Sequence, residues 1–139
     1  MTDLQLCKTA LHAMTHAYNP YSNFSVGAAL LCKNGSVYEG CNIENASYTP
    51  TVCAERVAFF KAVSEGNLEF KKIAIAGGSK GESLKICPPC GVCRQVMSEF
   101  CKKDFEILLV TDTGFEKYTL EQLLPLSFNL LEVKSDAHD

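Results

Sequence analysis

Apolar side chains recur at intervals of three or four residues near the start of the chain, at Leu4, Cys7, Leu11, Met14 and Tyr18. This spacing places them on one face of an α-helix. Asn19-Pro20 follows, and proline cannot continue a helix because its ring clashes with the preceding turn. The pattern therefore predicts an amphipathic helix from Leu4 to Tyr18.

The next two apolar runs, at 25–33 and 36–44, have the length and composition of β-strands. They are separated by Asn34-Gly35, which is the preferred residue pair for a tight type I′ turn. The pattern predicts an antiparallel hairpin.

Helices and strands alternate after the hairpin. The expected elements are a helix at 52–65, a strand at 72–76, a helix at 90–100, a strand at 105–110, a short element at 116–118 and a short helix from Leu120 to Pro125. This order predicts an α/β fold with three layers, α/β/α, around a mixed sheet that the antiparallel hairpin opens. In such folds ligands bind beside strand ends, at helix N-termini.

Two of the predicted helices begin with cysteine motifs, Thr51-Val52-Cys53-Ala54-Glu55-Arg56 and Pro88-Pro89-Cys90-Gly91-Val92-Cys93. A thiol at the positive N-terminal end of a helix ionises more easily. Cys53, Cys90 and Cys93 are therefore candidate ligands for one Zn²⁺ per chain. Three protein ligands leave a fourth position open, which is typical of catalytic zinc.

Cys90-x-x-Cys93 alone is ambiguous, because zinc ribbons and thioredoxin-like redox pairs use the same spacing. Glu55, two residues after Cys53, adds a carboxylate that can reach the open position. A Cys-x-Glu motif followed by Pro-Cys-x-x-Cys matches zinc deaminases, in which the glutamate does not bind the metal. A structural zinc or redox module that binds a partner is the alternative, but it leaves Cys53-Ala54-Glu55 unexplained.

Four segments, in this order, resemble the small homotetrameric cytidine deaminases over nearly the whole chain: 21–30, 40–48, 53–56 and 89–95. The resemblance implies a cytidine deaminase-like fold and zinc-dependent hydrolysis of cytidine and deoxycytidine to uridine and deoxyuridine, with release of ammonia, in pyrimidine salvage. A deaminase of the same fold with another small substrate, such as a cytosine-bearing antibiotic, stays open, since the catalytic motif does not set the substrate.

The resemblance also implies a role for the residues around the metal. Glu55 would take a proton from the attacking water and deliver it to the pyrimidine ring nitrogen, acting as base and then as acid. Three thiolates leave a zinc site negatively charged, and Arg56 would offset this charge by donating hydrogen bonds to a ligating sulfur. Arg94 is a second candidate for that role.

Substrate contacts follow from the same motifs. Phe24 would stack on the base, Ala54 would offer backbone groups to the base edge, and Asn42 and Glu44 would hold the ribose hydroxyls. Asn42 and Glu44 are two residues apart, so in a strand they share one face. Without the resemblance, Phe24 is interpreted as a core aromatic residue, and Asn42 and Glu44 as polar residues at strand ends.

The resemblance further implies a homotetramer in which some side chains reach a neighbouring subunit's site. The residues concerned are Ala46, Tyr48 and Phe128. The tail from Phe128 to Asp139 follows no pattern that we can place.

Cys87 supplies an extra thiol three residues before Cys90. Four thiols around zinc would give a closed, structural site. However, Pro88-Pro89 stiffens the link, and only Cys90 and Cys93 share a helix start, so we expect Cys87 not to bind the metal. The remaining cysteines lie mostly in apolar runs and are interpreted as small buried side chains.

His12 and His16 lie one helical turn apart and could bind a metal. The sequence places no carboxylate or third histidine beside them, so a surface or half-buried role is favoured.

Composition excludes several classes. With 139 residues, 47% of them hydrophobic, the chain is expected to form a single domain, 1–139. Its net charge of -3 and scattered basic residues argue against a nucleic-acid partner. No long apolar run predicts a membrane span or signal peptide, so a cytoplasmic enzyme is expected. The resemblance implies that its partner is a small nucleoside substrate.

Overall fold

The computed structural model describes residues 1–130 of the chain; residues 131–139, at the end of the tail, lie outside the described part. The elements are α1 (Asp3–Met14), β1 (Phe24–Cys32), β2 (Val37–Cys41), α2 (Ala54–Ser64), β3 (Phe70–Ser79), α3 (Gly91–Phe100), β4 (Glu106–Thr111), β5 (Gly114–Thr119) and α4 (Leu120–Leu123). Each predicted helix and strand is present, with shifted boundaries.

The five strands form one sheet in the order β2-β1-β3-β4-β5. β1 is antiparallel to β2 and to β3, and β5 is antiparallel to β4. β3 and β4 run parallel, and α3 lies in the connection between them. Parallel neighbours need such a long crossover, whereas antiparallel neighbours can be joined by a turn. The predicted mixed sheet opened by an antiparallel hairpin is confirmed.

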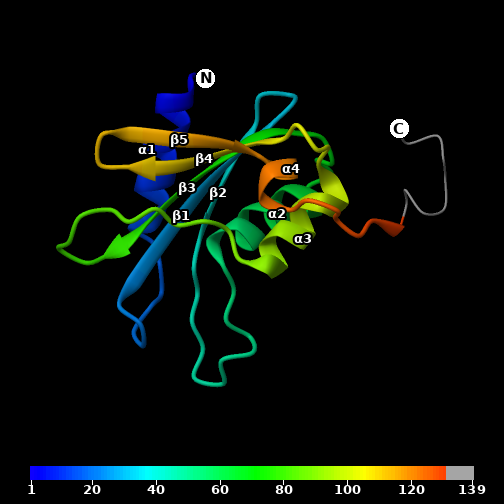
Figure 1. Cartoon of the computed structure of the whole chain (residues 1–139). Coiled ribbons are helices and arrows are strands. Elements are labelled where there is room, and N and C mark those ends of the chain that lie inside the picture. Colours follow the sequence, from blue (N-terminus) through cyan, green and yellow to red (C-terminus); the bar gives the residue numbers. More distant parts are fainter. Residues whose placement is uncertain (131–139) are drawn as a thin grey trace.

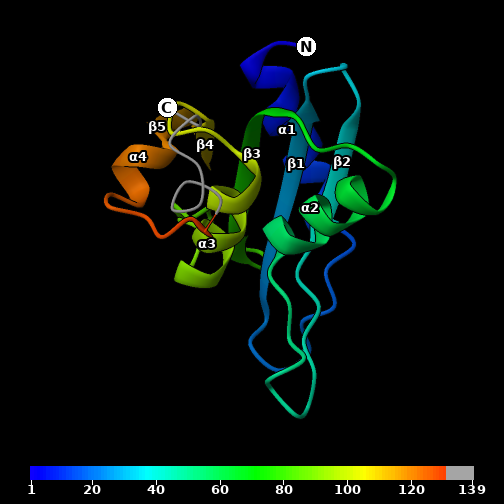
Figure 2. The same ribbon diagram turned by 90° about the vertical axis from the view of Figure 1, so that its right-hand side faces the viewer.

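Helices cover both faces of the sheet (Figure 1 and, turned by 90°, Figure 2). α1 packs over an apolar cluster that includes Leu6 and Leu108, and α2 and α3 pack over a second cluster that includes Phe59 and Met97. β1 and β3 are therefore buried on both faces, which is why their sequences are almost continuously apolar. The three-layer α/β/α arrangement is confirmed.

Phe59 fastens α2 to the rest of its layer. Its ring centre lies 5.0 Å from that of Phe70 on β3, 6.1 Å from that of Phe105 and 6.3 Å from that of Phe100 on α3. Such aromatic pairs contribute about 0.5–1.5 kcal/mol each beyond the area that they bury. Packing of Phe59 against the sheet and against α3 thus helps to position α2.

None of the helices within residues 1–130 combines the length and apolar character that crossing a membrane requires.

The first helix is shorter than predicted, because α1 ends at Met14. Tyr18 instead joins a segment 24 residues further along the chain: its N–H donates to the Asn42 carbonyl at 3.0 Å, and its carbonyl accepts from the Glu44 N–H at 2.8 Å. The prediction that the helix continues to Tyr18 was wrong. A long-range backbone pairing outweighs the local apolar period there.

The hairpin forms at the predicted place with a different turn. Leu31 pairs with Val37, and the Cys32 N–H donates to the Ser36 carbonyl at 2.8 Å, so residues 33–35 make a three-residue loop. A type I′ turn needs positive φ at both central residues, but in this loop only Gly35 has it, at 92°. Three-residue hairpins commonly end in a left-handed glycine of this kind. The prediction of a type I′ turn was wrong because the strand register moves the turn by one residue.

Gly40 sets how closely α2 approaches the sheet. A Cβ atom at this position would lie 2.2 Å from the Ala54 carbonyl oxygen and 2.7 Å from the Ala58 nitrogen. Both are backbone atoms of the first turns of α2, and they cannot move aside as a flexible side chain would. The helix that carries Cys53 and Glu55 at its start therefore rests directly on β2.

We expect Gly40→Ala to lower the free energy of unfolding by about 3 kcal/mol or more, since overpacking against rigid backbone falls at the upper end of such costs. Gly91→Ala is the matched control, because a Cβ atom there meets nothing within 4 Å. Chemical denaturation of both variants measures the difference. Equal stabilities would show that the close approach at Gly40 does not constrain α2.

Candidate functional site

The site is assembled at the first turns of α2 and α3. Cys53 is the N-cap residue of α2, with extended backbone (φ -73°, ψ 152°), and Cys90 is the N-cap residue of α3 (φ -70°, ψ 171°). Cys93 lies within the first turn of α3 and is fully buried. The structure thus brings together the thiols of two helix starts that lie 37 residues apart in sequence, as the motifs predicted.

The three thiols have the spacing that a zinc ion requires. The Cys53 and Cys90 sulfurs lie 3.7 Å apart, the Cys90 and Cys93 sulfurs 3.6 Å apart, and all three lie within 4.8 Å of one another. Tetrahedral zinc with Zn–S bonds of about 2.3 Å places its sulfur ligands about 3.8 Å apart. Among residues 1–130 this is the one group of three or more ligand side chains with such spacing, and Cys87 is not part of it.

Glu55 is buried beside the thiols. Its side chain lies in the first turn of α2 and is only 3% exposed. Burial raises the pKa of Glu55 to about 7, and the nearby Cys53 adds to this rise, while hydrogen bonds from its own backbone N–H and from Cys93 oppose it. A carboxyl group in this environment can both accept and release a proton near neutral pH.

Arg56 and Arg94 have different partners. The Arg56 guanidinium donates to the Cys53 sulfur at 3.6 Å, and its buried Nε has no hydrogen-bond partner. Arg94 donates to two backbone carbonyls, those of Pro89 and Leu123, at 2.7 Å and 2.5 Å. Arg56 therefore adds positive charge at the thiols, whereas Arg94 ties the start of α3 to α4.

Hydrogen bonding favours a thiolate at Cys53. Hydrogen bonds from Cys93 and then from Arg56 and Cys90 lower the pKa of Cys53 to about 5, although burial opposes this shift. The same pairing raises the pKa of Cys93, because its proton is held between the two sulfurs. One thiolate is thus prepared by the protein itself, and a bound cation would favour deprotonation of the others.

A cavity of about 290 Å³ adjoins the cluster. It is lined by Val26, Asn42, Glu44, Thr51, Val52, Cys53, Ala54, Glu55, Arg56, Cys87, Pro88 and Cys90. The predicted metal ligands Cys53 and Cys90, the predicted catalytic Glu55 and the predicted sugar contacts therefore border one small space. Its size is at the lower end of the range for small-molecule sites.

Asn42 and Glu44 lie in this cavity, but not on a strand. β2 ends at Cys41, so the prediction that the two share a strand face was wrong. An extended segment still carries both toward the cavity, because Ile43 between them bridges to Tyr18 and to Val52.

The polar groups of both side chains hold neighbouring backbone. The Asn42 side chain accepts from the Val26 N–H at 2.8 Å and donates to the Phe24 carbonyl at 2.9 Å. Glu44 accepts from the N–H groups of Tyr21 and Ser22, at 2.9 and 3.1 Å, and from the Ser22 hydroxyl. The Ser22 hydroxyl in particular lowers the pKa of Glu44, so this carboxyl group stays charged.

Phe24 and Cys87 meet at Gly77. A Cβ atom on Gly77 would lie 3.1 Å from a Phe24 ring carbon and 3.0 Å from the Cys87 sulfur. Cys87 lines the cavity, and burial raises its pKa to about 12. Phe24 is half-buried at the start of β1, next to this wall of the cavity.

The three residues predicted to reach a neighbouring subunit all lie on the outside. Ala46 is exposed, and Tyr48 and Phe128 are 77% and 66% exposed. Tyr48 has a positive φ of 61°, which is unusual for a side chain of this size. The segment around Phe128 docks on α3, since the Gln95 side chain donates to its carbonyl at 3.0 Å.

Sequence reasoning missed Tyr21, Ser22 and Thr51 as parts of the pocket region. Together with Glu44, Asn45 and Tyr48 they line a second hollow of about 420 Å³, and Glu44 and Thr51 border both spaces. Tyr21 and Ser22 belong to a motif that the sequence displays, but only the fold shows that they contact Glu44.

Three thiols at two helix N-termini, with a buried glutamate beside them, define a zinc-dependent deaminase site. Comparison with known proteins agrees. Residues 1–109 match the family model described as the cytidine and deoxycytidylate deaminase zinc-binding region. The chain belongs to this family, and it is an enzyme with a zinc cofactor.

Individual relatives support the same assignment. A cytidine deaminase of Halalkalibacterium halodurans is 50% identical over 124 residues, which cover 88% of this chain and 91% of that protein. The crystal structure of cytidine deaminase from Burkholderia pseudomallei superimposes with a TM-score of 0.83 at 44% identity, over 92% of this chain and 100% of that one. A more distant relative, the blasticidin-S deaminase of Bacillus cereus, is 32% identical over 130 residues, 91% of each chain.

We expect one zinc ion per chain, retained in Cys87→Ser and lost or much weakened in Cys53→Ala, Cys90→Ala and Cys93→Ala. A tetrahedral site with three protein ligands has no spare ligand. Metal analysis of the purified variants by mass spectrometry measures this. Loss of zinc in Cys87→Ser, with full retention in Cys93→Ala, would contradict the ligand set.

Proposed function

We propose that this enzyme hydrolyses cytidine and deoxycytidine to uridine and deoxyuridine with release of ammonia, in the salvage of pyrimidine nucleosides. The observation that carries the proposal is the shared cavity, which is lined by Glu55, by two thiols of the metal cluster, and by Asn42 and Glu44. A reactive centre and polar side chains that could bind a sugar thus border the same small space.

When bound by Cys53, Cys90 and Cys93, zinc supplies the Lewis acidity that makes a water molecule nucleophilic near neutral pH. Glu55 then performs the proton transfers. It takes a proton from the attacking water and delivers it to the ring nitrogen beside the amino-bearing carbon. A C–O bond forms at that carbon. Glu55 then carries the second proton of the water from the new hydroxyl group to the amino group, the C–N bond breaks, and ammonia leaves. The oxygen stays as the carbonyl of the product, and the ring nitrogen keeps the first proton. One buried carboxyl group serves as base and as acid.

Arg56 balances the charge of the cluster. Three thiolates around a dication leave a net negative charge, which disfavours ionisation of water. Arg56 donates to the Cys53 sulfur and withdraws electron density from it, while the two helix N-termini contribute partial positive charge. Both effects come from this chain's own residues and act before any substrate arrives.

Base and sugar contacts complete the pocket. Phe24 would stack on the pyrimidine from the wall near Cys87, and Ala54, at the first residue of α2, would present backbone groups to its edge. Asn42 and Glu44 would hold the ribose hydroxyls. Glu44 stays ionised and keeps lone pairs beyond the hydrogen bonds that it already accepts. The Asn42 amide and the Glu44 carboxylate together favour the ribose of a nucleoside. This supports cytidine over the alternative substrate, an antibiotic such as blasticidin S.

We further propose a homotetramer. Tyr48 adopts a strained backbone conformation that costs about 1–3 kcal/mol, yet its side chain extends into solvent. A neighbouring subunit that buries the ring would account for that cost. Ala46 on the same loop and Phe128 beyond α4 would contribute to neighbouring pockets in the same way.

We place this enzyme in the cytoplasm, as a single domain. The eight cysteines are all free thiols, which suits a reducing compartment. The strands of residues 1–130 all join one sheet, so the described chain offers no boundary between domains.

Sedimentation should show about four chains per particle, stable on dilution. Tyr48→Gly probes the contact itself, because glycine adopts the positive φ without strain. We expect this variant to keep its folded stability while losing turnover, tetramer stability or both. A fully active monomer would rule out the roles of Tyr48 and Phe128.

The sharpest test concerns Glu55. We expect Glu55→Ala to keep zinc, fold and cytidine binding while turnover falls by at least about 10⁴-fold, the upper end for general acid-base catalysis, because one residue serves several proton transfers. Glu99→Ala, an exposed change on α3, is the control. Turnover, zinc content and ligand binding are measured on one preparation, with blasticidin S as a second substrate. Near-normal turnover in zinc-loaded Glu55→Ala protein would overturn the mechanism.

A further inference from the structure

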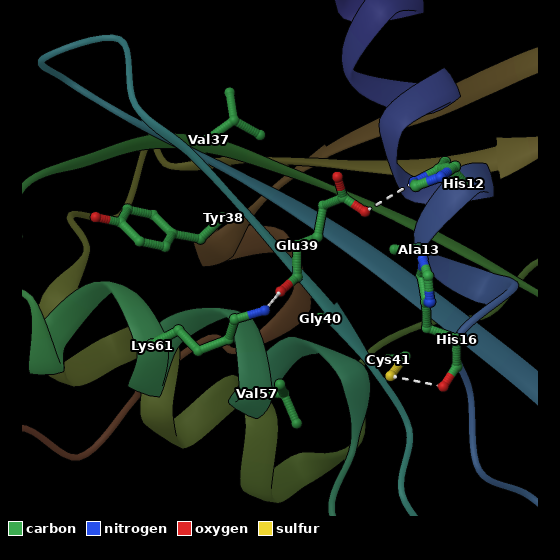
Figure 3. Close-up of a pocket in the computed structure, with 10 residues that line it drawn as sticks. All are labelled: His12, Ala13, His16, Val37, Tyr38, Glu39, Gly40, Cys41, Val57 and Lys61. Atoms are coloured by element: carbon green, nitrogen blue, oxygen red, sulfur yellow. Dashed lines mark hydrogen bonds and ion pairs between the residues drawn. The ribbon is translucent and has the colours of Figure 1, made fainter.

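A separate hollow, of about 440 Å³, lies beside the edge strand β2, away from both spaces described above (Figure 3). It shares no lining residue with the catalytic cavity. His12 and His16 border it from the α1 side, Glu39 and Cys41 from β2, and Lys61 from α2. Within this space the fold gathers two imidazoles, a carboxylate and a thiol.

The separation of the two imidazole rings suits a shared metal ion. Their centres lie 5.2 Å apart with an interplanar angle of 73°. Two imidazoles that bind one tetrahedral ion through Zn–N bonds of 2.0–2.1 Å have ring centres roughly 5 Å apart. Both side chains are exposed, so an ion can reach them from solvent.

Glu39 supplies the carboxylate that the sequence did not place beside the histidines. Its Oε1 lies 3.1 Å from Nδ1 of His12, although the two residues are 27 positions apart. When Nδ1–H donates to this carboxylate, the lone pair of the ring is on Nε2, free to bind a cation. Metal-binding histidines commonly have such a carboxylate partner, which fixes the tautomer and raises the basicity of the ring.

Lys61 does not compete for this position. Its ammonium group donates to the backbone carbonyl of Glu39, on the side of β2 that faces α2 (Figure 3). The histidine rings lie on the α1 side of the same strand. The Cys41 thiol donates to the His16 carbonyl at 3.4 Å, so it is engaged by backbone.

We propose that His12 and His16 form a second, weaker site for a first-row transition-metal dication such as Zn²⁺, Ni²⁺ or Cu²⁺, with Glu39 orienting His12. Two imidazole ligands suit these ions, and water completes the coordination. A site with two protein ligands exchanges its ion more readily than the three-thiol cluster. The bound ion joins the end of α1 to the turn that follows it, and through Glu39 to β2. This site is independent of the proposed function.

Nickel provides the test, because added Ni²⁺ is counted separately from resident zinc. The untagged, zinc-loaded protein is dialysed against increasing Ni²⁺, and both metals are measured by mass spectrometry. We expect one Ni²⁺ per chain with zinc retained. His12→Gln and His16→Gln should each abolish this binding, and Glu39→Gln should weaken it by about 10-fold or more, as for other second-sphere carboxylates.

Two controls isolate the site. His138→Gln removes the remaining histidine of the chain, and Cys41→Ser removes the thiol that lines the hollow; both should keep the nickel. Cytidine turnover should persist in all these variants, which separates the result from the catalytic proposal. Absence of nickel binding by the unaltered protein, its persistence in His16→Gln, or its loss in Cys41→Ser would overturn the inference.

Discussion

The contact between Gly40 and the first turns of α2 fixes the site to the sheet. Backbone rests against backbone there, with no side chain between, so a rigid surface sets how closely α2 approaches the sheet. Phe59 on the same helix adds packing against three aromatic neighbours. Because Cys53 and Glu55 belong to the first turn, their positions relative to β2, and hence to the segment that carries Asn42, follow from this contact.

The second helix start is positioned differently. α3 comes to the site through the crossover between the parallel strands β3 and β4. The Arg94 side chain donates to the Pro89 carbonyl, directly before α3, and to the Leu123 carbonyl of α4, so it ties the start of α3 to α4. The thiols therefore meet where two independently anchored helices converge. Thiolates held this close together repel one another in a poorly solvated space. Arg56 and the two helix N-termini supply positive charge that opposes this repulsion. Glu55 remains able to hold a proton because the same space disfavours its charge.

Much of this arrangement could be predicted from the sequence, because its signals are local. Proline before Cys90, the apolar runs of β1 and β3, and the cysteine spacing each report on a few neighbouring residues. The errors arose where distant segments meet. Tyr18 left the predicted helix to pair with the backbone of Asn42 and Glu44, and the hairpin turn followed the strand register and not the preference of Asn34-Gly35. The anchoring of Glu44 by Ser22 and of His12 by Glu39 likewise joins residues more than twenty positions apart, for which no local pattern exists.

The hydrogen bonds of Glu44 bear on the thermodynamics of ligand binding. This carboxylate already joins the 21–22 loop to the segment that leads to Thr51, and the backbone of that segment is pinned further by the pairing of Ile43 with Val52. The wall of the cavity formed by Glu44, Thr51 and Val52 is therefore preorganised, and little conformational entropy remains to be lost there when a ligand enters. A flexible wall would lose part of the binding free energy in ordering its loops. In a preorganised wall, that free energy contributes to affinity. In the proposed function, the rigidity of this wall would contribute to sugar binding in addition to the hydrogen bonds that the sugar accepts or donates.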